Sequence, residues 1–192
     1  MSAKSFRQLL GISDITASPT DSALIVIDAQ NEYAFGALAV TNVTSSAAVI
    51  ASLLEKYRQA NGKIVHVLHQ TPDGAPLFTP GTDLAEEMKE VKAKDAEEII
   101  WKNYPGSFTG TRLGELLKGW GTKKVVLVGY MAHVCVSTTA REAYQSGYQV
   151  ILVEDGIGDR DIPGATGEEI KKYALLEIHD VFGTVLKSSD LK

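Results

Sequence analysis

The sequence predicts an α/β fold, with three αβα layers built around a six-stranded, parallel, doubly wound (Rossmann-like) sheet. Two observations lead to this prediction. Short apolar runs of strand length recur along the 192 residues, and segments whose apolar residues have helical spacing separate them. Such alternation produces right-handed β-α-β units whose strands pair in parallel, and the functional site then lies beyond the carboxyl ends of the strands.

Composition limits the classes of protein that fit. The apolar fraction of 44% is ordinary for a globular protein, and the length suits one domain over residues 1–192, with 1–20 as a surface leader. A formal charge of −5 without a basic cluster argues against nucleic acid as a partner. No apolar run approaches the ~18 residues of a membrane span, so no membrane partner is expected. Because the chain shows no signal-peptide pattern we expect a cytoplasmic location, although secretion without a signal peptide would leave no mark.

The first part of the chain predicts two strands around one helix. The continuous apolar run Ala23–Ile27 is typical of a strand that is buried on both faces. Ser45–Ala60 has apolar residues at helical spacing and a serine able to cap its start (Ser45 or Ser46), and Asn61-Gly62 supplies its end. Lys63–His69 is the second predicted strand.

Shorter elements are predicted in the middle of the chain. Thr71–Thr82 is a loop rich in Pro, Gly and Thr, at the end of the sheet where a loop could set substrate choice or close over a site. We expect a short helix at Leu84–Lys94, a third strand at Glu98–Trp101 and an amphipathic helix at Thr111–Gly119.

The last third of the chain alternates strands and helices. Thr166 and Glu169 have capping-box spacing and would open the second of its helices. The expected elements are, in order, a strand at Lys124–Gly129, a helix at Val136–Ser146, a strand at Gln149–Val153, a helix from Thr166 to about Val181, and a strand at Phe182–Leu186.

Three side chains able to do chemistry lie where predicted strands end. Asp28 is the first charge after the first strand, Lys102 follows the third, and Cys135, the only cysteine, lies near the start of the helix after the fourth. Each has a plain structural alternative, respectively a turn residue, a surface lysine and a small buried hydrophobe. The dipole at a helix start would lower the pKa of the cysteine and favour its thiolate.

Together these three residue types suit acyl transfer. The Asp28 carboxylate can take the proton of the Cys135 thiol, and the Lys102 ammonium can hold the thiolate while it keeps the carboxylate ionised. Because parallel strands end at one edge of a sheet, we expect the three side chains to converge there on a small-molecule substrate.

Three segments also carry a family resemblance: ALIVIDAQNEY, WKNYPGSFTGTRLGELL and VVLVGYMAHVCVSTTAREAYQSGY. In this order and spacing they resemble the isochorismatase-like cysteine hydrolases, and the resemblance runs from Ala23 to the C-terminus. It implies a six-stranded parallel sheet, hydrolase activity, and catalytic roles for Asp28, Lys102 and Cys135. It also implies a homo-oligomer, either a dimer or a tetramer.

The same resemblance implies an oxyanion hole made of backbone groups. It places a cis, non-proline peptide bond at Tyr130–Met131, which would turn the Met131 N–H toward the site. That N–H and the N–H of Cys135 would then hold the oxyanion.

A metal is not predicted. Nicotinamidases of this family carry an Asp-x-His pair after the second strand and a further histidine, which bind a divalent metal. This chain has no such pair, and His66 and His69 are three apart in a strand, so their side chains point to opposite faces. We interpret both as packing or loop histidines, and we predict neither a metal nor another cofactor.

Two reaction chemistries stay open. Ala132-His133 is similar to the segment before the nucleophile position of true isochorismatases, whereas Cys135 favours covalent attack. We predict hydrolysis of a small amide or other C–N bond by the cysteine, with hydrolysis of the vinyl ether of isochorismate, which releases pyruvate, as the alternative. A non-enzymatic interaction protein on a hydrolase fold is a second alternative, and the intact catalytic residue types argue against it.

His133 and several aromatic residues are candidates for the substrate pocket. His133 could form a dyad with Cys135, but two residues before it in a tight turn we favour a hydrogen-bonding scaffold or a pocket wall. Aromatic side chains fill cores as well as sites, so their number near the three catalytic positions only makes them candidates. They are Tyr33, Phe35, Phe78, Trp101 and Tyr130.

Overall fold

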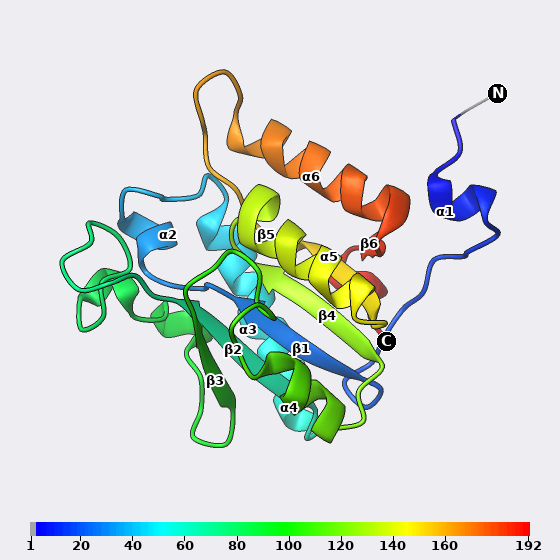
Figure 1. Cartoon of the computed structure of the whole chain (residues 1–192), viewed down its shortest axis with the longest axis horizontal. Helices are drawn as coiled ribbons and strands as arrows, with labels where there is room; N and C mark the ends of the chain where they lie inside the picture. Colours follow the sequence, from blue (N-terminus) through cyan, green and yellow to red (C-terminus); the bar gives the residue numbers. More distant parts are fainter. Residues whose placement is uncertain (1–2) are drawn as a thin grey trace.

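A parallel six-stranded sheet runs through the centre of the molecule, with the strand order β3-β2-β1-β4-β5-β6 (Figure 1). The computed structural model describes residues 3–192. The chain starts in the middle of the sheet, builds one half outward through β2 and β3, and then builds the other half from β4 to β6. The predicted α/β class is confirmed. The strands are β1 (Ser22–Ile27), β2 (Lys63–His69), β3 (Glu98–Lys102), β4 (Lys124–Gly129), β5 (Gln149–Ile157) and β6 (Thr184–Leu186).

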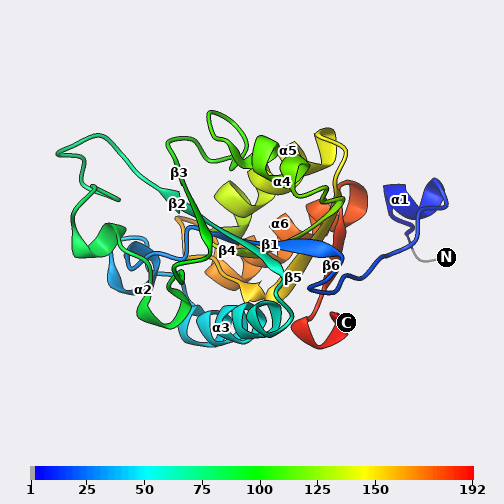
Figure 2. The same ribbon diagram turned by 90° about the horizontal axis from the view of Figure 1, so that it is seen from below.

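Helices cover both faces of this sheet (Figure 2). One face packs against α3 (Val43–Gln59), and the other packs against α4 (Leu113–Gly119), α5 (Ser137–Gln145) and α6 (Gly167–Val181). Two helices of one turn, α1 (Phe6–Leu9) and α2 (Glu32–Phe35), were not predicted, because so short a segment shows no helical periodicity.

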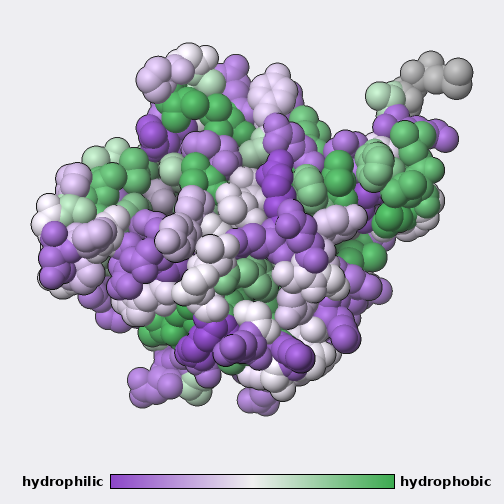
Figure 3. Space-filling view, viewed as in Figure 1, coloured by the Kyte–Doolittle hydropathy of each residue, from purple (hydrophilic) through white to green (hydrophobic). Residues whose placement is uncertain are grey.

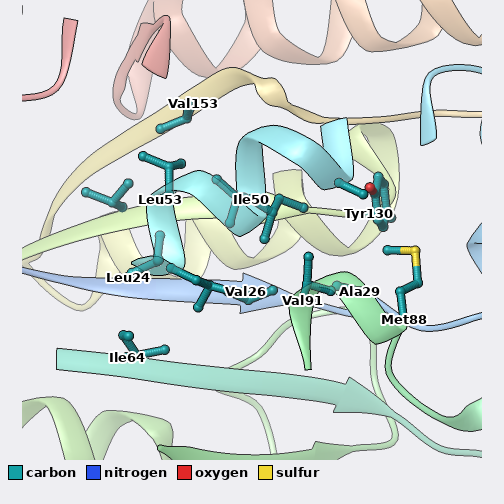
Figure 4. Close-up of a cluster of buried hydrophobic side chains, with 14 of the residues drawn as sticks. Leu24, Val26, Ala29, Ile50, Leu53, Ile64, Met88, Val91, Tyr130 and Val153 are labelled. Atoms are coloured by element: carbon teal, nitrogen blue, oxygen red, sulfur yellow. The ribbon is translucent and has the colours of Figure 1, made fainter. Parts of the chain in front are cut away.

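Alternation along the strands supplies both cores. Leu24 and Val26 of β1 point to the α3 side, where they belong to one cluster with Ile50 and Leu53 (Figure 4). Ile25 points to the other side, toward α4, α5 and α6. Burial of each such side chain contributes about 1.5–3 kcal/mol to stability, so β1 is held firmly from both faces. The residue that follows β1 is therefore held in a fixed position at the edge of the sheet.

The segment predicted as a helix at Leu84–Lys94 is not a helix. It forms two 3-10 turns, Asp83–Ala85 and Lys89–Val91. Between them the chain runs back along the exit of β1, where the Met88 N–H donates to the Ala29 carbonyl at 2.9 Å. Because the backbone groups of this segment bond to the β1 exit, they are not available for helical hydrogen bonds.

The N-terminus of α3 also differs from the prediction. This helix begins at Val43, so neither Ser45 nor Ser46 caps it. The Ser46 hydroxyl instead lies 2.8 Å from the Tyr130 hydroxyl, in a buried contact between α3 and the segment after β4. The serine therefore ties a helix to the edge of the candidate site.

Several other boundaries differ by a few residues. β5 continues to Ile157 instead of ending at Val153, and β6 begins at Thr184 instead of Phe182. The helix expected from Val136 is preceded by a π-helical turn, Ala132–Val136, which carries the cysteine. Such turns are found often at functional sites.

The leader packs on the surface next to the C-terminal half of α6. Arg7 of α1 is buried, and its guanidinium donates to the Gly183 carbonyl at 2.7 Å and pairs with Asp14 at 2.9 Å. Phe6, Leu9, Leu10 and Ile12 are exposed, and Figure 3 shows apolar surface where α1 lies. Within residues 3–192, no helix is both long and apolar enough to cross a membrane.

Candidate active site

Asp28 lies directly after β1, at the carboxyl edge of the sheet, and is fully buried. Its backbone has a φ of +49°, which is uncommon for a residue other than glycine. The Asp28 N–H donates to the Val67 carbonyl of β2 at 2.7 Å, so the neighbouring strand fixes the turn. This geometry directs the carboxylate into the protein instead of into solvent.

Lys102 ends β3 and is only 1% exposed. Alternation along β3 explains this burial, because Ile100 and Lys102 share the inner face while Ile99 and Trp101 are exposed. The Lys102 ammonium lies 2.8 Å from Asp28 Oδ2 and forms a buried ion pair with it.

Cys135 lies in the π-helical turn before α5 and is 5% exposed. Lys102 Nζ donates to Cys135 Sγ at 3.4 Å. The structure therefore brings Asp28, Lys102 and Cys135 together from the ends of three strands, as the sequence analysis expected from parallel topology.

The ammonium of Lys102 has two further partners. It lies 3.1 Å from His69 Nδ1, at the end of β2, and it donates to the Tyr104 carbonyl at 3.1 Å. Neither contact was predicted from the sequence. His69 also stands at a strand end, which is the signal that identified the other three residues, but it was interpreted as a packing or loop histidine.

Burial and neighbouring charge set the protonation of the three central groups. Burial raises the pKa of Asp28, and Lys102 opposes this effect. Burial lowers the pKa of Lys102, but the Asp28 carboxylate and the Cys135 sulfur raise it by a larger amount, so the pKa lies above its ordinary value. Lys102 therefore stays an ammonium.

The thiol of Cys135 differs from the expectation. Burial raises its pKa, the Asp28 carboxylate raises it further, and Lys102 only partly offsets the two effects. The position near a helix start was expected to lower this pKa, but burial and the adjacent negative charge outweigh the helix. The site therefore holds a neutral thiol beside an ion pair.

Met131 follows the fourth strand and stands just before the cysteine turn. The Tyr130–Met131 peptide bond is cis, as the family resemblance implied. Met131 is 6% exposed, and within residues 3–192 its N–H donates no hydrogen bond. A buried N–H of this kind is a donor available to a ligand.

His133 bonds to an aspartate of the neighbouring strand segment. The ring Nδ1 of His133 lies 2.8 Å from both carboxylate oxygens of Asp159, and the backbone N–H of His133 donates to Asp159 Oδ2 at 3.0 Å. This fits the scaffold interpretation better than a dyad with the cysteine. Asp159 was not identified from the sequence, because it lies after β5 beyond the expected end of that strand.

The aromatic candidates divide into two groups. Tyr33 stands between Phe78 and Tyr130, with ring centroids 5.3 Å and 5.7 Å apart. Burial first, and then the charge of Asp28, raise the pKa of Tyr33 well above its ordinary value, so its hydroxyl remains a donor. Phe35 and Trp101 are not brought to the site. Their side chains are exposed on α2 and on the outer face of β3.

Comparison with known sequences and structures gives a consistent result. Residues 22–190 match the family described as the isochorismatase domain. The secreted isochorismatase effector Isc1 of Verticillium dahliae is 57% identical over 187 residues, which cover 97% of this chain and 98% of that protein.

Two crystal structures extend the comparison. An isochorismatase from Pseudomonas putida KT2440 is 30% identical and superposes with a TM-score of 0.95 over 100% of both chains. The N-carbamoylsarcosine amidase from Thermoplasma acidophilum is 27% identical, with a TM-score of 0.77 over 90% of this chain and 99% of that one.

Proposed function

The chain belongs to the isochorismatase family and is a hydrolase, and from this premise we propose that it hydrolyses a small amide or related C–N bond through a covalent intermediate on Cys135. One observation carries the proposal. A single buried ammonium, Lys102 Nζ, lies 2.8 Å from the Asp28 carboxylate and 3.4 Å from the Cys135 sulfur. A base, a cation and a nucleophile are thus held within contact of one another.

In the proposed first step, Asp28 accepts the proton of the Cys135 thiol and the sulfur attacks the carbonyl carbon of the substrate. The raised pKa of Asp28 suits this transfer, because a more basic carboxylate takes a thiol proton at lower cost. The negative charge moves from carboxylate to sulfur within reach of Lys102. The N–H groups of Met131 and Cys135 bind the oxyanion that forms.

The second half of the reaction reverses these roles. The tetrahedral intermediate breaks its C–N bond, and the amine or ammonia leaves with the proton that Asp28 gained. A water molecule then gives a proton to Asp28 and attacks the thioester. Cleavage of the C–S bond releases the acid, and the proton on Asp28 returns to the Cys135 thiolate.

The substrate is small and its reacting end is desolvated. Asp28 is fully buried, and Lys102 and Cys135 are 1% and 5% exposed, so only a narrow group reaches the sulfur. The likeness to an amidase supports C–N chemistry. The rings of Tyr33 and Phe78 supply an apolar wall beside the reacting groups.

The covalent step is tested by intact-mass spectrometry. The protein is mixed with primary amides and ureido compounds and quenched during turnover, in parallel with Cys135→Ala. We expect the mass of one acyl group on the wild-type protein and none on the variant. An active wild-type enzyme that never carries an adduct, together with an unaffected Cys135→Ala, would refute the covalent scheme.

A second candidate function is hydrolysis of isochorismate, which the name of the 57% identical relative favours. In this reaction a protonated Asp28, whose pKa is raised by burial, gives its proton to the vinyl carbon. Water adds to the resulting oxocarbenium ion, and the adduct divides into pyruvate and the ring alcohol. No thiol takes part in these steps.

The two candidates predict different variants to be inactive. With isochorismate as substrate, pyruvate release measured by a coupled dehydrogenase would survive Cys135→Ala but not Asp28→Ala. With an amide, both substitutions abolish ammonia release. A wild-type protein that releases neither ammonia nor pyruvate from any of these substrates would favour an interaction protein over a hydrolase.

The location of the protein is part of the proposal. The relative from Verticillium dahliae is described as secreted, which counts against the cytoplasmic location expected from the sequence. We therefore propose that this chain also acts outside the cell. Fractionation of producing cells tests this, since the proposal requires the protein in the medium without a cytosolic marker.

A further inference from the structure

His69 contacts the Lys102 ammonium from the end of β2. Its Nδ1 lies 3.1 Å from Lys102 Nζ. An ammonium can only donate, so the imidazole nitrogen must accept. The pKa of His69 is lowered to about 4 by burial and by the charge of Lys102, which keeps the ring neutral at pH 7 and leaves that nitrogen free to accept.

The protons of Lys102 are fewer than its acceptors. The ammonium has three N–H bonds. Two neutral acceptors, His69 Nδ1 and the Tyr104 carbonyl, lie at 3.1 Å each. The two reacting groups, the Asp28 carboxylate and the Cys135 sulfur, lie at 2.8 and 3.4 Å. Once the neutral acceptors have taken two protons, a single proton remains for the two reacting groups.

We propose that His69 is a positioning residue which, together with the Tyr104 carbonyl, fixes Lys102 so that one ammonium proton is shared between Asp28 and Cys135. When the S–H bond of the thiol breaks and the proton passes to Asp28, negative charge moves from carboxylate to sulfur. The shared Lys102 proton follows this charge without a rotation of the ammonium. The inference rests on the proposed covalent function of the same three residues, and it adds a donor geometry that is set before the reaction begins.

His69 is itself held on several sides. The backbone N–H of His69 donates to Gln30 Oε1 at 2.9 Å, and Gln30 Nε2 donates to the backbone carbonyl of His69 at 2.8 Å. Gln30 is fully buried and lies just after Asp28, so it locks the end of β2 to the exit of β1. The imidazole ring also stands edge-on to Phe78, with centroids 5.1 Å apart. These contacts orient the ring toward Lys102 independently of substrate.

Two substitutions of His69 distinguish a role in positioning Lys102 from a role in packing alone. In His69→Gln the side-chain oxygen can still accept from Lys102, whereas in His69→Leu an apolar group of similar size cannot. The readout is the rate of Cys135 alkylation by iodoacetamide between pH 6 and 10, followed by intact mass. We expect His69→Leu to react about tenfold more slowly at pH 7, with the inflection of the profile moved to higher pH, and His69→Gln to stay within about threefold.

Equal rates and equal inflections in wild type and His69→Leu would overturn the proposal. Melting curves of both variants show whether either has lost its fold. If His69→Leu does not fold, ¹⁵N NMR of the histidines in the wild-type protein decides. The proposal requires a neutral His69 at pH 7 with a proton on Nε2 and none on Nδ1, and a proton on Nδ1 would contradict it.

These readouts are independent of the proposed function. The NMR measurement reports the contact between His69 and Lys102 without any turnover. If Cys135→Ala keeps full amidase activity, the covalent function fails even where the histidine contact is observed. If the covalent function holds and His69→Leu behaves as wild type, only the positioning role fails.

Discussion

At the scale of single residues, the site depends on groups whose charges are compensated inside the protein. Lys102 and Asp28 are both removed from water, and each would be costly to bury alone. Their contact offsets this cost for both groups, and in the proposed reaction the neighbouring thiol is the group that gives up a proton. Because the pKa of Cys135 is raised, the proposed mechanism forms the thiolate only as Asp28 takes this proton.

Asp28→Asn tests this dependence. The amide keeps the shape of the side chain but cannot accept the thiol proton, so we expect the rate of hydrolysis to fall by a factor of about 10² to 10⁴. Glu32→Gln is the matched control, because Glu32 is also a fully buried carboxylate and its Oε1 accepts from the Leu38 N–H, whereas Asp28 pairs with Lys102. Steady-state kinetics should show the loss only in Asp28→Asn. Equal rates in the two variants would remove Asp28 from the reaction.

At the scale of elements, strand ends explain what the sequence could predict of the site. Asp28, Lys102 and Cys135 each follow an apolar strand run, and parallel pairing brings such positions together. Trp101 was a poor candidate on the same grounds, because neighbours in a strand point to opposite faces. The contribution of Tyr104 is a backbone carbonyl, which no side-chain pattern encodes.

Helix ends were predicted with uneven success. The capping box of α6 is present as expected, with both reciprocal bonds between Thr166 and Glu169. Ser45 or Ser46 was expected to cap α3, but the helix begins earlier, at Val43, and the Ser46 hydroxyl contacts the Tyr130 hydroxyl instead. A local motif can be predicted from the sequence when its partners lie within a few residues. It cannot be predicted when a residue far along the chain contacts the same group.

Thr166→Ala tests the cap of α6. The substitution removes the acceptor for the Glu169 N–H, and we expect the free energy of unfolding to fall by about 1 kcal/mol, the usual cost of a lost N-cap. Urea denaturation measures this change. Thr20→Ala, at an exposed turn residue, serves as control and should change stability by less than about 0.5 kcal/mol.

At the scale of the whole molecule, a buried ionic cluster joins β2 to the segment before β3. The two ring nitrogens of His66 lie 2.7 Å from Glu87 and 3.1 Å from Glu97. Glu97 also pairs with Arg58 of α3 at 2.6 Å. The cluster thus connects a helix, a strand and the segment that packs on the β1 exit.

Glu97 makes the stability of the fold depend on pH. Burial raises its pKa, but the bonds from Arg58 and from the Lys94 N–H outweigh burial, so the net pKa is lowered. A carboxyl whose pKa is lower in the folded state stabilises it above the unfolded pKa, and this contribution is lost as pH falls through the folded value. Glu97 therefore favours the folded state at neutral pH and ceases to do so in acid.

Glu97→Gln checks the sign of this effect. We expect the variant to lose about 1–3 kcal/mol of unfolding free energy at pH 7, and the difference from wild type to shrink as pH falls below about 4. Glu86→Gln is the control, since the Glu86 carboxylate is exposed and its ion pair with Lys92 is long, at 4.0 Å. Urea unfolding at several pH values gives the comparison, and a difference that grew toward acid would contradict the assignment.

The covalent role of Cys135 is tested most directly by turnover of wild type and Cys135→Ala side by side. Both proteins are given the same panel of primary amides, ureido compounds and isochorismate, with ammonia and pyruvate measured as products. The proposed function predicts that wild type releases ammonia from at least one amide or ureido compound and that Cys135→Ala releases none above background. Ammonia release by Cys135→Ala at the wild-type rate would contradict it.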